Sequence, residues 1–306
     1  MVGNRKGKHI LESDEVIAII SDQFPQLNPQ KVKLLGVGSD NIAYLINDEL
    51  VFRFSRSSGA ASFLKNEHSI LPLIAPKLRL AIPIPLWFGQ PTEIYPMPFS
   101  GYRIIEGIKA THVNFSVADR LKFVEPLASF LSALHSTPLT DEMKVQLPDD
   151  SLWWIKIEQF VDDVRKGLAE LASLGLFEIN KRLNEINDAV ENIRFQKKSM
   201  LVHGDLYISH MIVNKDHQLT GVIDWGHIHL GDHAEDLAIA HLLLPVQAHQ
   251  SFRSIYGGIY EETWRIARLR ALYYCCYYAR EGYHTKDQFL LSACLEALNL
   301  ISEQDL

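Results

Sequence analysis

The segment from Met200 to Gly226, MLVHGDLYISHMIVNKDHQLTGVIDWG, constrains the fold more than any other part of the chain. Short apolar runs alternate in it with polar loops, a pattern that predicts strand, loop, strand, loop. The first loop carries His203, Asp205 and His210, and the second begins at Asp224. A lone aspartate after a strand is more often a turn former, and a lone histidine is more often structural, so only the joint spacing of these residues supports a functional interpretation.

The bulk composition narrows the class of protein. A chain of 306 residues with 47% hydrophobic and 22% charged residues can bury a substantial core, as one large or two modest domains. The net charge of −7 argues against nucleic acid or an anionic membrane as partner, since either demands a basic field. No signal peptide and no apolar span of about 20 residues is present, so a cytoplasmic protein is expected.

The cysteines also favour a cytoplasmic protein. Cys275, Cys276 and Cys294 include no CxxC pair, which indicates neither a disulfide framework nor a zinc site. We interpret them as core thiols in a reducing compartment. The histidine-rich run at 227–233 lacks an HExxH motif or a cysteine partner and does not predict a metal site.

The N-terminal part predicts a small antiparallel sheet with helices. A helix capped by Ser13 should end at Pro25, and apolar runs at 32–35, 42–46 and 50–54 predict strands joined at the Asn47-Asp48 turn. Helical spacing follows over 60–73. Prolines then punctuate a region of further short strands, so residues 1–106 are predicted to form one lobe.

Beyond residue 107 the period becomes helical. Ser116 and Asp119 resemble a capping box, and one apolar stripe runs from Val117 to Leu131. Further helices are predicted over 151–174, 178–194, 234–244, 262–280 and 288–301. Residues 107–306 should thus form a larger helical lobe, and the cleft between the lobes is the expected ligand site.

The 200–226 segment resembles the aminoglycoside and macrolide phosphotransferases. Their catalytic loop follows the kinase HxDxxxxN layout, and their metal-binding loop has an aspartate at the end of a strand. The resemblance extends, more weakly, over nearly the whole chain. It implies an α+β, bilobal protein-kinase-like fold and the transfer of a phosphoryl group from ATP or GTP, with Mg²⁺, to a hydroxyl of a small molecule.

The resemblance also implies roles for the loop residues. Asp205 would accept or orient the proton of the acceptor hydroxyl, and Asp224 would bind magnesium. His210 stands where the kinase pattern has a metal-binding asparagine, and we interpret it as a variant metal ligand or a neighbour of one. His203 and the GDxxxDL element, with Asp232 and Asp236, would support the catalytic loop.

Nucleotide binding is assigned to the first lobe. The turn LGVGSDN would cover the phosphates through Gly36, Gly38 and Ser39, although such a turn is usually only a hairpin. Arg53 takes the place of the kinase lysine with Glu67 as its partner; the alternative is a surface ion pair. Ile104 and Ile105 would offer backbone groups to the nucleobase.

The acceptor is less constrained. Carboxylates favour an aminoglycoside, with Glu235 and Glu281 as substrate contacts and Glu261 and Glu262 as further candidates. The aromatic run 270–283 is first interpreted as core packing, but its Tyr277, together with Tyr274 and Tyr278, could form the apolar wall that a macrolide needs.

Other functions remain open from the sequence. The same machinery serves metabolite kinases of the choline, homoserine or sugar type. The departures at Arg53 and His210 leave room for a non-catalytic nucleotide-binding pseudokinase. A protein kinase is disfavoured because no activation segment separates Asp224 from the helix at 234. We expect a monomer or weak dimer.

Overall fold

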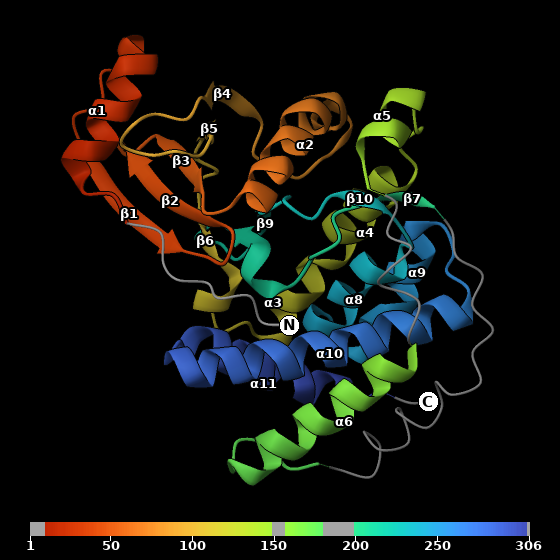
Figure 1. Cartoon of the computed structure of the whole chain (residues 1–306). Helices are drawn as coiled ribbons and strands as arrows, with labels where there is room; N and C mark the ends of the chain where they lie inside the picture. Colours follow the sequence, from red (N-terminus) through yellow and green to blue (C-terminus); the bar gives the residue numbers. More distant parts are fainter. Residues whose placement is uncertain (1–9, 149–156, 180–198, 305–306) are drawn as a thin grey trace. The chain divides into compact units, whose positions relative to one another are not determined.

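The computed structural model describes residues 10–148, 157–179 and 199–304, which divide into two compact units (Figure 1). Unit 1 holds the described residues up to Ala75 together with Pro83–Ile105. Unit 2 holds Pro76–Ile82 and the described residues from Glu106 onward. The 76–82 segment groups with unit 2 because Ala81 bridges to Gly221 there. The predicted α+β class is confirmed: a sheet dominates unit 1 and helices dominate unit 2.

Unit 1 is built on a five-stranded antiparallel sheet of order β1-β2-β3-β5-β4. The Asn47-Asp48 turn joins β2 to β3 with φ of 52° and 58°, the left-handed pair that a tight hairpin requires. Its strands are β1 (Val32–Val37), β2 (Asn41–Ile46), β3 (Leu50–Ser55), β4 (Pro85–Gly89) and β5 (Phe99–Arg103).

Two helices complete unit 1. Helix α1 spans Ser13–Gln23 and α2 spans Ser58–Ile74. The prediction that Ser13 caps α1 is wrong: Glu12 is the N-cap and forms a capping box with Glu15, which leaves Ser13 as the first helical residue.

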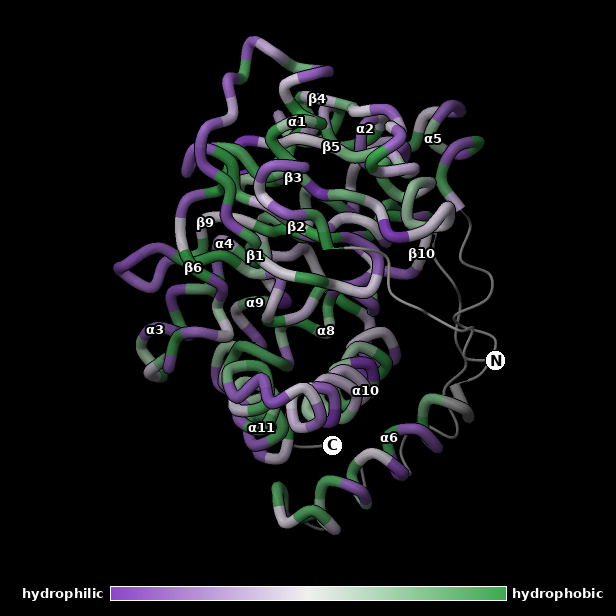
Figure 2. The backbone as a smooth tube through the Cα atoms, turned by 60° about the vertical axis from the view of Figure 1, so that its left-hand side comes forward, coloured by the Kyte–Doolittle hydropathy of each residue, from purple (hydrophilic) through white to green (hydrophobic). Residues whose placement is uncertain are grey.

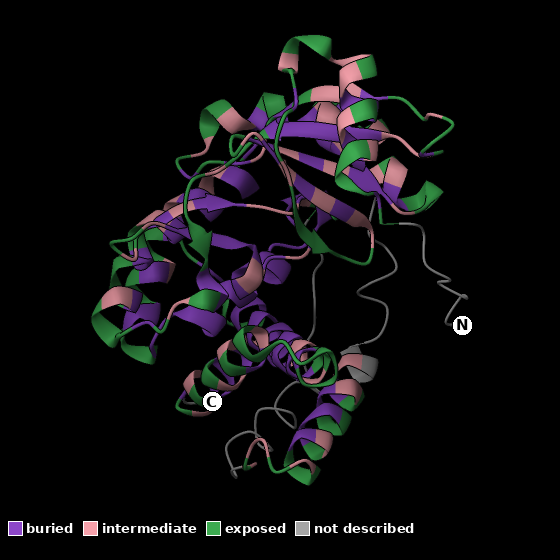
Figure 3. Cartoon of the chain, turned by 90° about the vertical axis from the view of Figure 1, so that its left-hand side faces the viewer, coloured by how far each residue is buried: buried purple, intermediate pink, exposed green. Residues whose placement is uncertain are grey.

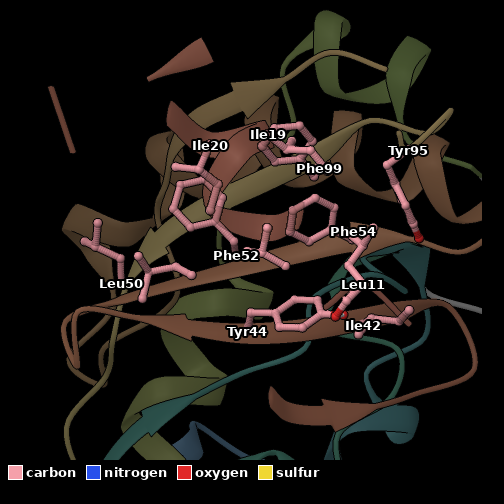
Figure 4. Packing of buried hydrophobic residues seen from close by; sticks show 12 residues of the cluster. Leu11, Ile19, Ile20, Ile42, Tyr44, Leu50, Phe52, Phe54, Tyr95 and Phe99 are labelled. Carbon is pink, nitrogen blue, oxygen red and sulfur yellow. The ribbon is translucent and has the colours of Figure 1, made fainter. Parts of the chain in front are cut away.

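The core of unit 1 is aromatic (Figure 4). Phe54 stacks on Phe99 with ring centroids 4.6 Å apart, and Tyr44 meets Phe54 edge to face at 5.6 Å. Helix α1 adds Ile19 and Ile20 to the same cluster. Because side chains alternate along β3, Phe52 and Phe54 enter this core while Arg53 lies on the opposite face.

Unit 2 contains two small antiparallel sheets, which hold the loops of the 200–226 segment. One has the order β6-β8-β9, with β6 (Ile108–Lys109), β8 (Met211–Val213) and β9 (Leu219–Val222). The other pairs β10 (His229–Gly231) with β7 (Met200–Val202). The strands predicted in this segment are therefore present.

The described helices of unit 2 differ from the predictions at a few points. The capping box of Ser116 and Asp119 is present, but the stripe from Val117 to Leu131 is broken at Phe123, and Val117 is exposed. The helix predicted over 178–194 lies almost wholly outside the described residues. The helices are α3 (Val117–Lys122), α4 (Val124–His135), α5 (Asp141–Gln146), α6 (Ile157–Ser173), α8 (Ala234–Leu243), α9 (His249–Tyr256), α10 (Glu261–Thr285) and α11 (Gln288–Ser302).

Helices α8 and α10 form the interior of unit 2. Every residue of α8 is buried, and α10 is buried on most sides because α6, α8 and α11 pack against it (Figure 3). Helix α6 approaches closely at Gly167, where an added Cβ would stand 2.5 Å from the Cβ of Cys276. The cysteines are free and buried as predicted, and burial raises the pKa of Cys276 to about 12.

Helix α6 shows polar and apolar residues in alternation along its length (Figure 2). Its apolar side, with Val164 and Leu168, is buried, as expected of a helix that packs on one face. Within the described ranges, no helix is both long enough and apolar enough to span a bilayer.

Candidate functional site

The Asp205 loop leaves β7 through a tight bend at Gly204. Gly204 has φ +83°, and a Cβ there would lie 2.5 Å from the carbonyl oxygen of His227 and 2.6 Å from the ring of His229. Only glycine fits both the backbone conformation and the space. The bend turns Asp205 out of the interior, where its side chain keeps 20% of its surface exposed.

His203 links this loop to the one that carries Asp224. Its Nε2 donates to the carbonyl of Ile223 at 3.0 Å, and its Nδ1 accepts from the backbone N–H of Asp205 at 3.3 Å. The ring is therefore in its neutral form, in agreement with burial, which lowers the pKa of His203. Its contacts agree with the predicted supporting role.

Asp236, at the start of α8, accepts hydrogen bonds from the loop backbone. Its carboxylate receives the N–H of His203 at 2.8 Å, the N–H of Gly204 at 3.0 Å and Nε2 of His135 at 3.0 Å. Burial alone would raise the pKa of Asp236, but the hydrogen bond and charge of His135 and those of His203 outweigh it, so this pKa lies below its usual range. The buried carboxylate thus holds the loop in place.

A second layer of buried groups holds His135. The Tyr256 hydroxyl lies 2.9 Å from Nδ1 of His135 and 2.8 Å from Nδ1 of His233. Asp232 accepts from the N–H of Ala234 at 2.9 Å at the beginning of α8. Sequence reasoning missed His135 and Tyr256, because they lie about 100 and 20 residues from Asp236 and no local motif marks them.

His210 and Asp224 form the part of the site that could hold a cation. Nδ1 of His210 donates to the carbonyl oxygen of Asp205 at 2.8 Å, so Nε2 points the other way, 3.4 Å from a carboxylate oxygen of Asp224. Asp224 has φ +64° and a half-exposed side chain. Strained backbone of this kind is common at functional sites. The structure thus brings Asp205, His210 and Asp224 together.

These groups fit a magnesium ion in part. In the described ranges no cluster of three or more His, Cys, Asp or Glu side chains forms a complete metal cage. Mg²⁺ rarely needs one, because it usually takes one or two carboxylates, retains waters and binds the phosphates of its substrate. The Asp224 oxygen suits it, and the imidazole nitrogen of His210 is the less usual ligand.

Aromatic rings surround Asp205 on the side of α10. The Tyr278 hydroxyl lies 3.2 Å from one carboxylate oxygen of Asp205 and 3.5 Å from the other. Tyr278 stacks on Tyr207, with centroids 3.8 Å apart and planes within 6°. Tyr274 stacks beside both rings, with centroids 5.9 Å from each. Sequence reasoning named Tyr278 only as a wall residue and missed Tyr207; the available signal was the i, i+4 spacing of Tyr274 and Tyr278 on one helix face.

The three residues predicted to contact the substrate differ in their exposure to solvent. Glu235, expected to face substrate or solvent, is 1% exposed, with a carboxylate oxygen 3.5 Å from Nε2 of His229. That expectation is wrong, because α8 is buried on every side. Tyr277 and Glu281 are both exposed, in the C-terminal half of α10.

In unit 1, Arg53 and Glu67 form the predicted pair. Nη1 of Arg53 lies 2.8 Å and 3.1 Å from the carboxylate oxygens of Glu67, whose side chain is fully buried. The Tyr102 hydroxyl donates to the same carboxylate at 2.6 Å. The pair is therefore not the surface ion pair considered as the alternative. Burial and the Glu67 charge raise the pKa of Tyr102, so the hydroxyl stays a donor.

The other residues assigned to the nucleotide lie at the end of β1 and on the turn after it, and directly after β5. Gly36 has open space around it, Gly38 accepts from Arg56 through its carbonyl oxygen, and the Ser39 hydroxyl bonds Asp40. The N–H of Ile104 is already donated to Glu49 at 2.9 Å. Of the backbone groups predicted to contact the nucleobase, the carbonyl of Ile104 and the backbone of Ile105 are thus the better candidates.

One cavity of about 490 Å³ lies elsewhere in unit 2. It shares no residue with the site around Asp205: its walls come from the beginning of α10, from α9 and from Gln304. Trp264, in this wall, precedes Tyr278 by about 20 Å along the helix axis at about 1.5 Å per residue. The convergent polar groups lie around Asp205 and not at this cavity.

Comparisons with known proteins agree with this arrangement. A family model described as the phosphotransferase enzyme family (APH) matches residues 31–272. The solved GDP complex of aminoglycoside 2'-phosphotransferase-IIIa is similar at 23% identity and a TM-score of 0.68, over 95% of this chain and 99% of that one. Macrolide 2'-phosphotransferase MphH from Brachybacterium faecium matches at 20% identity and a TM-score of 0.60, over 96% and 99%. Macrolide 2'-phosphotransferase type I matches at 18% and 0.60, also over 96% and 99%.

Proposed function

This chain belongs to the phosphotransferase enzyme family, and we propose that it transfers the terminal phosphoryl group of ATP or GTP to a hydroxyl of an antibiotic. The observation that carries the proposal is the convergence of Asp205, His210 and Asp224 on loops that His203 and Asp236 hold together. Phosphoryl transfer passes through a loose transition state. The protein therefore contributes mainly by aligning the reactants and neutralising charge, and it need not bond covalently to the substrate. The Asp205 loop would supply the alignment, and a cation held by Asp224 and His210 would supply the positive charge.

Asp205 takes the catalytic role. Its carboxylate is partly exposed and accepts hydrogen bonds only, so it can hold an acceptor hydroxyl in line and receive its proton. The backbone N–H groups of His203 and Gly204 donate to Asp236 and so fix the chain just before Asp205. This limits the movement of the Asp205 carboxylate. Such fixed positioning is the main contribution that a protein can make to phosphoryl transfer.

Asp224 and Nε2 of His210 would hold the magnesium ion, which when bound neutralises charge on the phosphates. In unit 1, phosphate contacts are assigned to Arg53, whose guanidinium the buried Glu67 holds, and to the backbone of the turn with Gly36, Gly38 and Ser39.

A macrolide is the acceptor class that the described residues favour. The side chains beside Asp205 are aromatic: the partly exposed Tyr207 and Tyr278 stack on each other, the buried Tyr274 backs them, and Tyr277 extends the wall with half of its surface exposed. A large, mostly apolar ligand gains from such a wall. The solved structures do not separate the two acceptor classes, because aminoglycoside and macrolide phosphotransferases both match, so the aromatic wall alone carries this choice.

The carboxylates that favoured an aminoglycoside in the sequence do not gather at Asp205. Glu235 is buried, and Glu261 pairs with Arg253 at 2.9 Å, about 25 Å along α10 from Tyr278 at about 1.5 Å per residue. Glu262 is its neighbour in sequence. Among these candidates only Glu281 is exposed within one turn of Tyr278. An aminoglycoside remains the second candidate, supported by that residue.

Steady-state transfer to erythromycin and to kanamycin, with ATP and with GTP, tests the proposal. We expect turnover of erythromycin with a KM that changes little between low and high salt, since an apolar wall is not screened. Turnover of kanamycin alone, with a KM that rises with salt, would contradict the macrolide assignment. Asp205→Asn is the control and should lower kcat by about 10² to 10⁴ while nucleotide affinity stays within a few fold.

A further inference from the structure

The Tyr278 hydroxyl is hydrogen-bonded to the carboxylate of Asp205, the group proposed to receive the acceptor proton. A carboxylate only accepts hydrogen bonds, so the contacts of 3.2 Å and 3.5 Å make the phenol the donor to both oxygens. Burial and the charge of Asp205 raise the pKa of Tyr278 far above its ordinary value, which keeps the proton on the phenol. Tyr278 thus makes the hydrogen bond that the acceptor would make.

Packing holds this phenol in position. The ring lies flat on Tyr207, at 3.8 Å and 6°, and meets Tyr277 edge to face at 5.0 Å. Tyr207 follows Asp205 in the catalytic loop and Tyr278 comes from α10, so the contact joins two elements. The hydroxyl is therefore brought to Asp205 by the fold rather than by a mobile side chain.

On the premise of the proposed kinase function, we infer that Tyr278 is a positioning residue that takes the acceptor's place on Asp205 until an acceptor displaces it, and so suppresses transfer to water. In that side reaction a water oxygen bonds to the terminal phosphorus of the nucleotide. The bond from this phosphorus to the bridging oxygen breaks, its electron pair leaves with the nucleoside diphosphate, and the water proton passes to Asp205. A water that cannot donate to Asp205 is poorly oriented for this attack.

The inference predicts two linked effects of removing the hydroxyl. A hydrogen bond to a charged carboxylate typically changes an equilibrium by about 10-fold or more, so freeing Asp205 should raise NTP hydrolysis in the absence of acceptor by about that factor. The acceptor no longer has to displace the phenol, so its KM should fall, because the competent fraction of free enzyme rises. A purely structural role would move KM upward or leave the hydrolysis rate alone.

Tyr278→Phe is the test variant because it keeps the ring on Tyr207 and loses only the hydroxyl. Tyr283→Phe is the matched control: it makes the same change on the same helix, at an exposed tyrosine outside the site. Phosphate release without acceptor, and KM for erythromycin, are measured for both. We expect about 10-fold faster hydrolysis and a lower KM for Tyr278→Phe alone. The gain should vanish in the Asp205→Asn, Tyr278→Phe double variant.

Three results would overturn the inference. The first is an unchanged hydrolysis rate in Tyr278→Phe, the second is an equal rise in Tyr283→Phe, and the third is phosphate found on wild-type Tyr278 by mass spectrometry, which would make the phenol an acceptor. If Tyr278→Phe loses its native melting transition, Tyr278→Met replaces it, since an unbranched thioether can lie on the Tyr207 ring. The hydrolysis readout needs no acceptor. A chain that hydrolyses NTP as expected but phosphorylates neither antibiotic would contradict the acceptor assignment and leave the inference standing.

Discussion

Unit 1 and unit 2 bury different kinds of side chain around their site residues. In unit 1 the Arg53–Glu67 pair adjoins a sheet whose other face is covered by aromatic and aliphatic groups, among them Phe52 and Phe99. In unit 2 the Asp205 loop is hydrogen-bonded to the buried carboxylate of Asp236, which His135 contacts in turn. Hydrophobic packing is non-directional, whereas hydrogen bonds specify the direction of each partner.

The contrast suggests a division of labour within the chain. A lost contact in the hydrophobic core of unit 1 leaves a cavity, which lowers stability but removes no hydrogen bond of the strand. A buried carboxylate that receives several donors differs, since each lost bond leaves an unsatisfied buried group. Substitutions in the two regions should therefore separate stability from catalysis.

The largest effect is expected for Asp236→Asn. Asparagine has only one acceptor oxygen for the N–H groups of His203 and Gly204 and for the His135 ring, and its amide N–H₂ would face donors. We expect the free energy of unfolding to fall by about 3 to 5 kcal/mol and kcat of the folded fraction to fall more than about 10-fold. Urea unfolding and initial rates measure both, with exposed Asp216→Asn as control. If Asp236→Asn lowers stability but leaves kcat unchanged, the hydrogen bonds of Asp236 do not position Asp205 for catalysis.

Phe99→Ala provides the counterpart in unit 1. The side chain is fully buried and stacks on Phe54 at 4.6 Å, so its removal should cost about 3 to 5 kcal/mol of unfolding free energy. We expect kcat per folded molecule to stay within about twofold, because no polar contact of the site is lost. Unfolding curves and active-site-normalised rates test this. A kcat loss as large as that of Asp236→Asn would break the comparison.

Acidification should weaken unit 2 through its buried histidines. Burial, with the charge of Arg268 and Arg253, lowers the pKa of His249 to about 4. Below about pH 6.5 the unfolded chain binds a proton at His249 that the folded chain does not, so stability falls as pH drops from about 6.5 to about 4. The loss from this residue is about 3 kcal/mol at 1.36 kcal/mol per unit. A histidine paired with a carboxylate would show the opposite pH dependence, because its contribution to stability is lost as the pH rises.

His249→Gln tests the assignment, since an amide can still donate to the carbonyl of Leu244 and does not titrate. We expect the free energy of unfolding of this variant to depend less steeply on pH between 6.5 and 4 than that of the wild type. Equal slopes for the two proteins would assign the acid sensitivity to other groups, such as His241, whose pKa burial also lowers.

The smallest effect concerns the cation at His210. His210→Asn should retain about 10-fold more activity than His210→Ala, because the amide oxygen is a hard ligand that can replace the imidazole beside Asp224. Initial rates over a magnesium titration measure the difference. Equal magnesium dependence in the two variants would place His210 outside the metal site.

Much of the fold followed from local patterns. The apolar run at 50–54 predicted the strand that presents Arg53 to Glu67, and the HxD spacing marked the loop of Asp205. Local patterns failed where burial comes from distant elements. Glu235 was expected to face substrate or solvent, but α10 and α11 pack against α8 and leave it buried on every side.

The sequence by itself determined the chemistry: the order of strands and loops that carry His203, Asp205, His210 and Asp224, since these lie within one short segment. Only the tertiary structure decided what surrounds that chemistry. Tyr278 reaches Asp205 across 73 positions, and His135 reaches Asp236 across 101. No periodicity spans such separations, because contacts of this kind depend on how helices pack, which follows from the summed burial of many side chains. These contacts and the acceptor wall are therefore properties of the folded chain.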